Sequence, residues 1–248
     1  MKQSEIIVGI IGGSGMDDPQ ILDKPQTQVI STPFGKPSDK LLTGKINGKK
    51  VIILPRHNKK HSLNPTNVPY RANIWALKEV GCTHILATTA CGSLKEKFVP
   101  GDLAFPNQFI DFTKLRNLTF FNDKVVHTAM ADPFDKDLRL KLAETAKKLK
   151  LKHHKSGTII TIEGPRFSTR AESKMFQLLG ADLINMSTVP EVILAAELNI
   201  PYQSIAMVTD YDCWREGEES VSFEMILERM KENTEKVKIL LIEVIKAI

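Results

Sequence analysis

Two aspartates near position 210 are the side chains best suited to proton transfer. Asp210 and Asp212 follow an apolar run and stand two positions apart, so both would point to one side of an extended chain. A neighbouring like charge raises the pKa of a carboxyl group, and a proton held between two carboxylates suits a general acid. The alternative is an ordinary solvated loop or helix cap, which is a common position for Asp.

A second set of residues has the chemistry of an anion site. Arg56 and His57 follow the apolar run at 51–54, and the first apolar run ends in Gly-Gly-Ser-Gly at 12–15. A guanidinium binds anions through several N–H groups, and a glycine-rich loop can offer backbone amides and the Ser14 hydroxyl to phosphate. The loop matches neither the dinucleotide fingerprint nor the P-loop. Taken alone, it could be a plain tight turn, and Arg56 could form a surface ion pair.

Small polar residues close the other apolar runs. Residues 88–93 read Thr-Thr-Ala-Cys-Gly-Ser, residues 163–168 read Glu-Gly-Pro-Arg-Phe-Ser, and residues 185–187 read Asn-Met-Ser. Such residues let a backbone approach a ligand closely, although an ordinary turn would look the same. Phe167 can stack on a planar ring or pack in the core. Ser187 precedes an expected helix start, where backbone amides favour an anion.

The cysteines and the nearest histidines indicate no metal chemistry. Cys82, Cys91 and Cys213 lack C-x-x-C spacing, so we expect neither a zinc site nor a disulfide framework. Cys91 has no visible base, and we expect a buried, inert thiol. His57 and His61 are four apart, but no acidic cluster or H-E-x-x-H motif accompanies them, so we expect no metal.

Alternating strands and helices must position these residues. Short apolar runs predict buried strands at 6–11, 51–54, 84–89, 103–105, 158–162, 183–186 and 202–208. Amphipathic stretches predict helices at 67–80, 137–151 and 221–248, and capping boxes begin at Thr169 and Thr188. We therefore expect one α/β domain over residues 1–248, with a central mixed, mainly parallel sheet flanked by helices. Ligands bind beyond the carboxyl ends of such strands, where the polar residues lie.

Composition excludes several classes of protein. The chain has 248 residues, of which 42% are hydrophobic and 25% charged, so it can build a globular core. It has no apolar run near the roughly 20 residues of a membrane helix, and the run at 6–11 is too short for a signal peptide. We expect a reduced, cytoplasmic protein without a membrane partner. The net charge of +5 is scattered in short Lys pairs, so a nucleic-acid partner is not expected.

The order and spacing of these motifs resemble one family. The chain is similar to the trimeric purine nucleoside phosphorylases, specifically the 5′-methylthioadenosine phosphorylases, from about residue 8 to residue 229. The segments that carry the resemblance are 12–15, 56–57, 88–93, 163–168, 185–191 and 209–212. It implies the nucleoside phosphorylase fold and phosphate-dependent cleavage of 5′-methylthioadenosine to adenine and 5-methylthioribose-1-phosphate. It also implies no cofactor or metal, with inorganic phosphate as co-substrate and adenosine and deoxyadenosine as further candidate substrates.

The resemblance also implies roles for single residues. The phosphate would be bound by Ser14, Arg56, His57, Thr89, the Ala90 amide and Ser187. The ribose would rest on Met186, and the purine would contact Phe167 and Ser168. The catalytic pair would be Asp210, at N7 and the exocyclic amine, and Asp212, which supports it. In a homotrimer, the 5′ pocket would combine His127 from a neighbouring subunit with an apolar wall of Phe223 and Ile226.

Three other activities stay open at this level. Members of the family that prefer 6-oxopurines carry Asn and Glu in the base site, so Asp210 favours adenine. A hydrolytic nucleosidase of the same superfamily would use water, which needs no group of anion ligands such as Arg56 and its neighbours. A non-catalytic nucleoside-binding protein would bind adenine without turnover.

Overall fold

A mixed β-sheet runs through the computed structural model, which describes residues 5–12, 21–215 and 223–248, with only the backbone for 223–227. The strands are β1 (Ile7–Gly12), β2 (Asp23–Gln28), β3 (Leu41–Ile46), β4 (Lys49–Pro55), β5 (His84–Ser93), β6 (Leu103–Ala104), β7 (Gln108–Phe112), β8 (His153–His154), β9 (Thr158–Ile162), β10 (Leu183–Asn185) and β11 (Tyr202–Asp210). The helices are α1 (Tyr70–Glu79), α2 (Lys136–Lys148), α3 (Arg170–Leu178), α4 (Thr188–Glu197) and α5 (Phe223–Ala247), and a 3₁₀ turn, η2, spans Pro65–Asn67.

Most strand pairs in this sheet are parallel. The strand order is β2-β3-β4-β1-β5-β10-β9-β7, and β11 pairs with β5 and β6. The central β4–β1–β5–β11 pairings are parallel, as are β10–β9 and β9–β7, whereas β2–β3, β3–β4, β5–β10 and β6–β11 are antiparallel. The predicted α/β fold with a mixed, mainly parallel central sheet is confirmed. That residues 1–248 form one domain stays a prediction.

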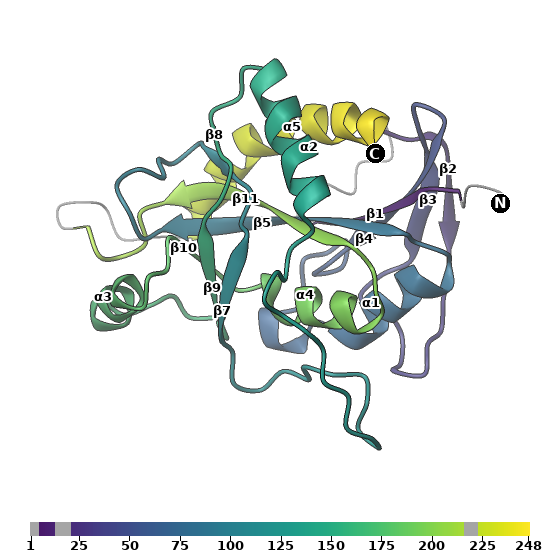
Figure 1. The fold of residues 1–248 in the computed structure, drawn as a ribbon, viewed down its shortest axis with the longest axis horizontal. Helices are drawn as coiled ribbons and strands as arrows, with labels where there is room; N and C mark the ends of the chain where they lie inside the picture. The colour runs from purple at the N-terminus through teal and green to yellow at the C-terminus, as the bar shows by residue number, and fades with distance from the viewer. Residues whose placement is uncertain (1–4, 13–20, 216–222) are drawn as a thin grey trace.

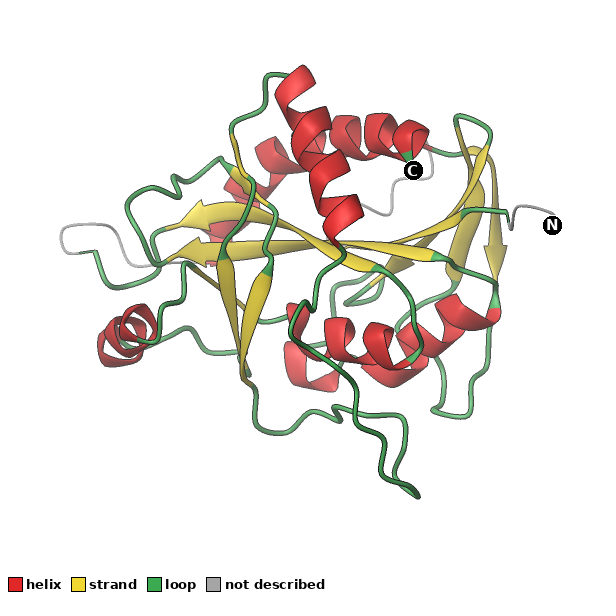
Figure 2. Ribbon diagram, in the orientation of Figure 1, coloured by secondary structure: helices red, strands yellow, loops and turns green. Residues whose placement is uncertain are grey.

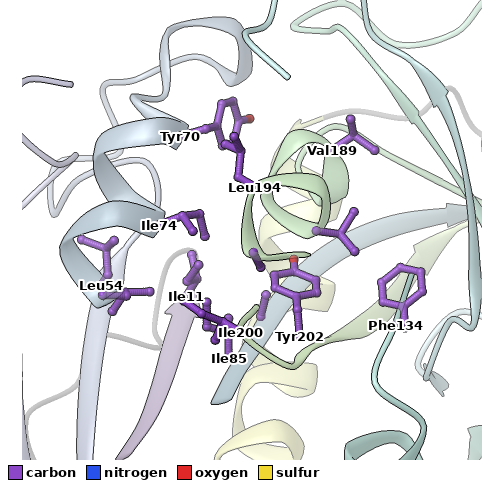
Figure 3. Close-up of a cluster of buried hydrophobic side chains, with 14 of the residues drawn as sticks. Ile11, Leu54, Tyr70, Ile74, Ile85, Phe134, Val189, Leu194, Ile200 and Tyr202 are labelled. Carbon is purple, nitrogen blue, oxygen red and sulfur yellow. The ribbon is translucent and has the colours of Figure 1, made fainter. Parts of the chain in front are cut away.

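Helices cover both faces of the sheet. In Figures 1 and 2, α2 and α5 lie above it, while α1 and α4 lie below. The alternation of side chains along each strand explains both layers. Ile10 packs in the buried cluster that includes α2 and α5 residues, and the next residue, Ile11, packs in the cluster that includes α1 and α4 residues. Figure 3 shows Ile11 with Ile74 of α1 and Leu194 of α4 in the second cluster.

Every strand predicted from an apolar run is present, with ends shifted by a few residues. The three predicted helices correspond to α1, α2 and α5, and the Thr169 capping box begins α3. Four strands, β2, β3, β7 and β8, were not predicted. The side chains of β2 are all exposed, those of β7 are only partly buried, β3 buries only its first and last residues, and β8 has two residues, so none presents a buried apolar run.

The predicted capping box at Thr188 is wrong. Val189 has extended backbone angles (φ −98°, ψ 131°), which interrupt α4 near its first residue. The Thr188 hydroxyl accepts a hydrogen bond from Asn185 Nδ2, and the Glu191 carboxylate binds Arg56 in place of a helix-start amide. Glu191 pairs with Arg56 and does not cap the helix, because an unpaired buried guanidinium would cost far more free energy than a missing cap.

One edge of β5 has a gap in its pairing. On this edge residues 84–87 pair with β1, and residues 92–93 pair with the antiparallel β10. Between them, residues 88–91 have no partner strand on this edge within the described ranges, although β11 pairs along the opposite edge. The sheet therefore opens a crevice between β1 and β10, in the position where α/β sheets bind ligands.

Candidate active site

A cavity of about 430 Å³ lies at this crevice. Its volume falls in the range of small-molecule sites. The residues predicted for the site that line it are Arg56, His57, Thr89, Ala90, Phe167, Ser168, Met186, Ser187, Asp210 and Asp212. They come from five separate segments of the chain, so the fold brings together what the sequence separates.

Hydroxyl groups from two segments meet on one wall. Thr89 Oγ1 lies 2.7 Å from Ser187 Oγ, and either atom can donate. Asn185 Nδ2 donates to Thr89 Oγ1 at 3.0 Å, and Asn185 Oδ1 accepts from Thr161 Oγ1 at 2.8 Å. Both hydroxyl-bearing residues are buried, so Asn185 fixes the orientation of a polar pair that can donate to an anion.

Arg56 is held on three sides beside these hydroxyls. Its Nε donates to Glu191 Oε1 at 2.6 Å and its Nη2 to Glu191 Oε2 at 3.1 Å, while Nη1 donates to the Thr88 carbonyl at 2.8 Å. Burial alone would lower the pKa of Arg56, but the Glu191 carboxylate outweighs it and the pKa is raised. Arg56 therefore stays a cation, and it is not the surface ion pair that the sequence left open.

His57 enters the cavity as a neutral ring. Burial, with a smaller contribution from the charge of Arg56, lowers its pKa to about 4. Its Nδ1 lies 2.7 Å from the carbonyl oxygen of Leu63. Because a carbonyl only accepts, Nδ1 carries the ring proton and Nε2 is left as an acceptor. A protonated oxygen of a bound oxyanion could donate to that atom.

The two aspartates lie at another wall of the cavity, but the chain does not stay extended through them. A β-bulge leaves Thr209 outside the pairing of β11 with β5, and Asp212 has a left-handed backbone (φ 50°). The extended chain that would put both side chains on one side is therefore absent here, although both residues line the cavity. Asp210 accepts from Thr209 Oγ1 and from the Asp212 amide, each at 2.7 Å.

The environment of Asp210 raises the pKa of its carboxyl group above the ordinary value. Burial is the main cause of its raised pKa, the Thr209 and Asp212 hydrogen bonds oppose the rise, and the Asp212 charge adds to it. The predicted effect of a neighbouring carboxylate is thus present but secondary. Asp212 in turn accepts from the Ser168 hydroxyl at 3.1 Å. A group poised this way can donate a proton inside a cavity.

Aromatic and thioether side chains line the space near these carboxylates. Phe167 is 40% exposed, so it lies at the rim and is not a core residue. Met186 also lines the cavity, and a Cβ at Gly164 would come within 2.5 Å of its sulfur. The backbone of Gly164 has φ 67°, so the close approach and the turn both require glycine.

Four predicted residues are not found at this cavity. His127 is exposed in the long segment between β7 and α2 and does not line it. Ser14 lies outside the described residues. Phe223 and Ile226 belong to α5, but their side chains lie outside what the structure describes.

Several residues that shape the cavity have no role predictable from the sequence. Glu191 was interpreted as a helix cap, and its partner Arg56 lies 135 residues away, so no local signal could reveal the pair. Asn185 begins the Asn-Met-Ser segment at 185–187, but its residue type alone predicts no function for it. Met230, from the apolar pattern of α5, and residues 61–65 also line the cavity.

The described residues hold neither a metal-binding cluster nor a membrane-spanning helix. Across residues 5–12, 21–215 and 223–248, no three His, Cys, Asp or Glu side chains gather as a metal site. No helix in that part of the chain has the length and hydropathy to cross a membrane. Cys91 is buried, as predicted, and burial raises the pKa of its thiol; its lack of reactivity stays a prediction.

Comparisons with known proteins agree with this geometry. The model of the phosphorylase superfamily matches residues 7–246. The S-methyl-5′-thioadenosine phosphorylase of Xenopus tropicalis is 55% identical, over 97% of this chain and 88% of its own, and that of Danio rerio is 53% identical, over 100% and 90%.

Solved structures give the same answer. The methylthioadenosine phosphorylase from Schistosoma mansoni in complex with adenine has a TM-score of 0.94 and 44% identity, covering 98% of this chain and 92% of its own. A point mutant of the adenosine/methylthioadenosine phosphorylase from that organism, in complex with methylthioadenosine, has a TM-score of 0.93 and 43% identity, covering 98% and 91%. The chain therefore belongs to the phosphorylase superfamily, and within it to the S-methyl-5′-thioadenosine phosphorylases.

Proposed function

We propose that this chain cleaves the N-glycosidic bond of 5′-methylthioadenosine with inorganic phosphate, releasing adenine and 5-methylthioribose-1-phosphate. One observation carries the proposal. Within a single cavity, Arg56 and Thr89 form an anion-binding wall, while buried Asp210 is poised to donate a proton. Thr89 and Gly92, the pairing partner of Asp210, stand three residues apart on β5, which is about 10 Å along a strand. A sugar bound between the two walls would face phosphate on one side and hold its base on the other.

The chemistry follows from charge development in the cleaved bond. As the bond breaks, positive charge grows on the ribose and negative charge on the departing purine. Phosphate held by Arg56, Thr89, the Ala90 amide and Ser187, with Ser14 as a further proposed ligand, stabilises the cation and then forms the new C1′–O bond. A proton from Asp210 to N7, supported by Asp212, neutralises the purine, and such help is worth about 10²–10⁴-fold.

His57 has a distinct part in this proposal. Its neutral ring offers Nε2 as an acceptor, so it accepts a hydrogen bond from a protonated phosphate oxygen and adds no positive charge. Because the charge of Arg56 is already paired with Glu191, phosphate is held by directed N–H and O–H groups more than by net charge.

The base and sugar contacts complete the assignment. Phe167 and Ser168 would border the purine, Met186 the ribose, and Phe223 and Ile226 the 5′ group. Relatives are named for methylthioadenosine, and one structure is titled an adenosine/methylthioadenosine phosphorylase, so adenosine and deoxyadenosine are candidate further substrates. No cofactor is needed, because phosphate is itself the second substrate.

We also propose a homotrimer in the cytoplasm. The long segment between β7 and α2 projects from the body of the chain in Figure 1. It carries exposed Leu115, and exposed Val125 and Val126 directly precede His127. Exposed apolar side chains in one segment favour burial against another subunit. His127 would then reach the 5′ pocket of a neighbouring copy. If light scattering shows a stable monomer and that monomer is fully active, both the homotrimer and the proposed reach of His127 are refuted.

Product analysis tests the reaction itself. Purified protein is incubated with methylthioadenosine, with and without phosphate, and adenosine and inosine are run in parallel. We expect adenine and methylthioribose-1-phosphate only when phosphate is present. Equal adenine release without phosphate would mean hydrolysis and would remove the phosphate roles assigned above. Preferential cleavage of inosine would overturn the role of Asp210.

A further inference from the structure

Glu191 is a fully buried acid in direct contact with the anion-binding wall. Its two carboxylate oxygens accept from Nε and Nη2 of Arg56, and Tyr202 donates its hydroxyl to Oε2 at 2.9 Å. The exposed fractions of the Arg56 and Glu191 side chains are 3% and 0%. In Figure 3 the Tyr202 hydroxyl is turned toward helix α4, which carries Glu191. Burying such an ion pair is costly unless its donors and acceptors form hydrogen bonds. Here Tyr202 donates to Glu191, and the Thr88 carbonyl accepts from Arg56.

The contacts of Arg56 leave two of its N–H groups as hydrogen-bond donors for a ligand. A guanidinium has five N–H groups in one rigid plane. Two are taken by Glu191 and one by the Thr88 carbonyl, so two remain without a partner in the described part of the chain. Because the group is planar, fixing three N–H directions also fixes the other two. Arg56 borders the cavity, where those two groups are available to an anion.

We propose that Glu191, held by Tyr202, is a positioning residue for phosphate binding: it sets the plane of the Arg56 guanidinium. This rests on the proposed function, in which Arg56 binds phosphate. A bare counter-ion role would have the opposite consequence. If Glu191 only neutralised Arg56, removing its charge would strengthen attraction for an anion. If it sets the guanidinium plane, removing its charge weakens phosphate binding even though the cavity becomes more positive.

Steady-state kinetics of two variants distinguish these roles. Glu191→Gln keeps size but puts an NH₂ group against an Arg56 donor, and Tyr202→Phe removes only the hydroxyl that holds Oε2. For Glu191→Gln we expect the phosphate KM to rise about 10-fold or more, which is the loss expected for a charge-assisted hydrogen bond. The methylthioadenosine KM should stay within about 2-fold. Tyr202→Phe should show the same pattern with a smaller rise of about 2–5-fold.

Ser204→Ala is the matched control. Ser204 lies on β11 two residues from Tyr202, is buried, and has a hydroxyl without a hydrogen-bond partner among the described atoms. The variant removes a buried hydroxyl from the same strand without touching Arg56 or Glu191, so both KM values should stay at wild type. Stabilisation of the protein by phosphate in a melting experiment gives a readout without turnover. It should shrink in Glu191→Gln and Tyr202→Phe and persist in Ser204→Ala.

An unchanged or lower phosphate KM in Glu191→Gln would overturn the proposal, as would equal rises in both KM values. If Glu191→Gln does not fold, Tyr202→Phe decides by the same criteria. Failure of the proposed function looks different, because wild-type protein would then release adenine without phosphate. Wild-type dependence on phosphate, together with variants like wild type, would reject only the positioning role.

Discussion

Replacing Asp210 by Asn tests proton donation to the purine at one atom. The Asp212 amide donates to Asp210 Oδ1, so the Asn carbonyl would keep that position. Its NH₂ group would then take the place of Oδ2, which now accepts from Thr209. The variant thus puts a fixed donor where the wild type has a carboxyl group that can hold or release a proton.

The structure allows the catalytic and structural costs to be separated. The Thr209 hydroxyl would lose one acceptor, but the Cys91 carbonyl at 3.2 Å offers another, so the stability loss is about 1 kcal/mol. For a chain of this size that lowers Tm by about 2–4 °C. Loss of general acid help is worth about 10²–10⁴-fold, or roughly 3–5 kcal/mol in the barrier. The rate should therefore fall far more than stability.

The assay compares kcat/KM on methylthioadenosine and inosine at saturating phosphate. We expect Asp210→Asn to lower the methylthioadenosine value at least about 100-fold and to raise the inosine-to-methylthioadenosine ratio, because an amide N–H can donate to a 6-oxo group. Asp182→Asn is the control, since this buried carboxylate pairs with Lys95 and does not line the cavity. An unchanged substrate ratio in Asp210→Asn would refute the assignment of this residue to the base.

Thr209→Val removes the donor that lowers the pKa of Asp210, so that pKa should rise further, and the loss of rate on the alkaline side should move to higher pH in a pH–rate profile. Gly92→Ala would bring a Cβ within 2.9 Å of Asp210 Oδ1 and 3.0 Å of Ile184 Cγ2, so we expect the kcat/KM for methylthioadenosine to fall about 10–100-fold. In the folded protein the pKa of His57 is about 4, against an ordinary 6.5 in the unfolded chain. Between these two pH values the unfolded chain binds more protons, so the free energy of unfolding falls as the pH falls from 6.5 to 4. Between pH 7 and 5 the wild type should lose up to about 2 kcal/mol more unfolding free energy than His57→Gln, measured by urea denaturation; equal losses would contradict the shifted pKa.

The strand-end residues could be predicted because parallel strands bring their carboxyl ends to one region. Arg56 follows β4, Thr89 lies in β5 and Asp210 ends β11, and all three line one cavity although their numbers span most of the chain. A short apolar run followed by polar residues is a local signal, and the sheet rule turns it into a spatial one. The same rule needs no knowledge of strand order.

Pairings between distant side chains could not be predicted in this way. Glu191 matched a capping box, yet its carboxylate binds Arg56, because long-range charge pairing in a buried site outweighs a local cap. The backbone conformation at Asp212 could not be predicted for a related reason. The bulge at Thr209 and the left-handed backbone of Asp212 are not visible in the alternation of side chains. Strand β2 has only exposed side chains and gave no apolar signal.

The gap in β5 pairing explains why the anion-binding wall and the proton donor both lie beside this strand. Residues 84–87 pair with β1 and residues 92–93 with β10, so residues 88–91 have no partner strand on that edge among the described residues, and their backbone groups can bind side chains there. The Thr88 carbonyl is one of these backbone groups, and it accepts a hydrogen bond from Arg56. Arg56 follows β4 and lies on the β1 side of the gap. From the β10 side comes Asn185, which orients Thr89. Along the opposite edge, the bulge in β11 sets Asp210 against Gly92. A strand that kept a full partner on both edges could not hold all three, so the change of partner along one edge of β5 creates the site.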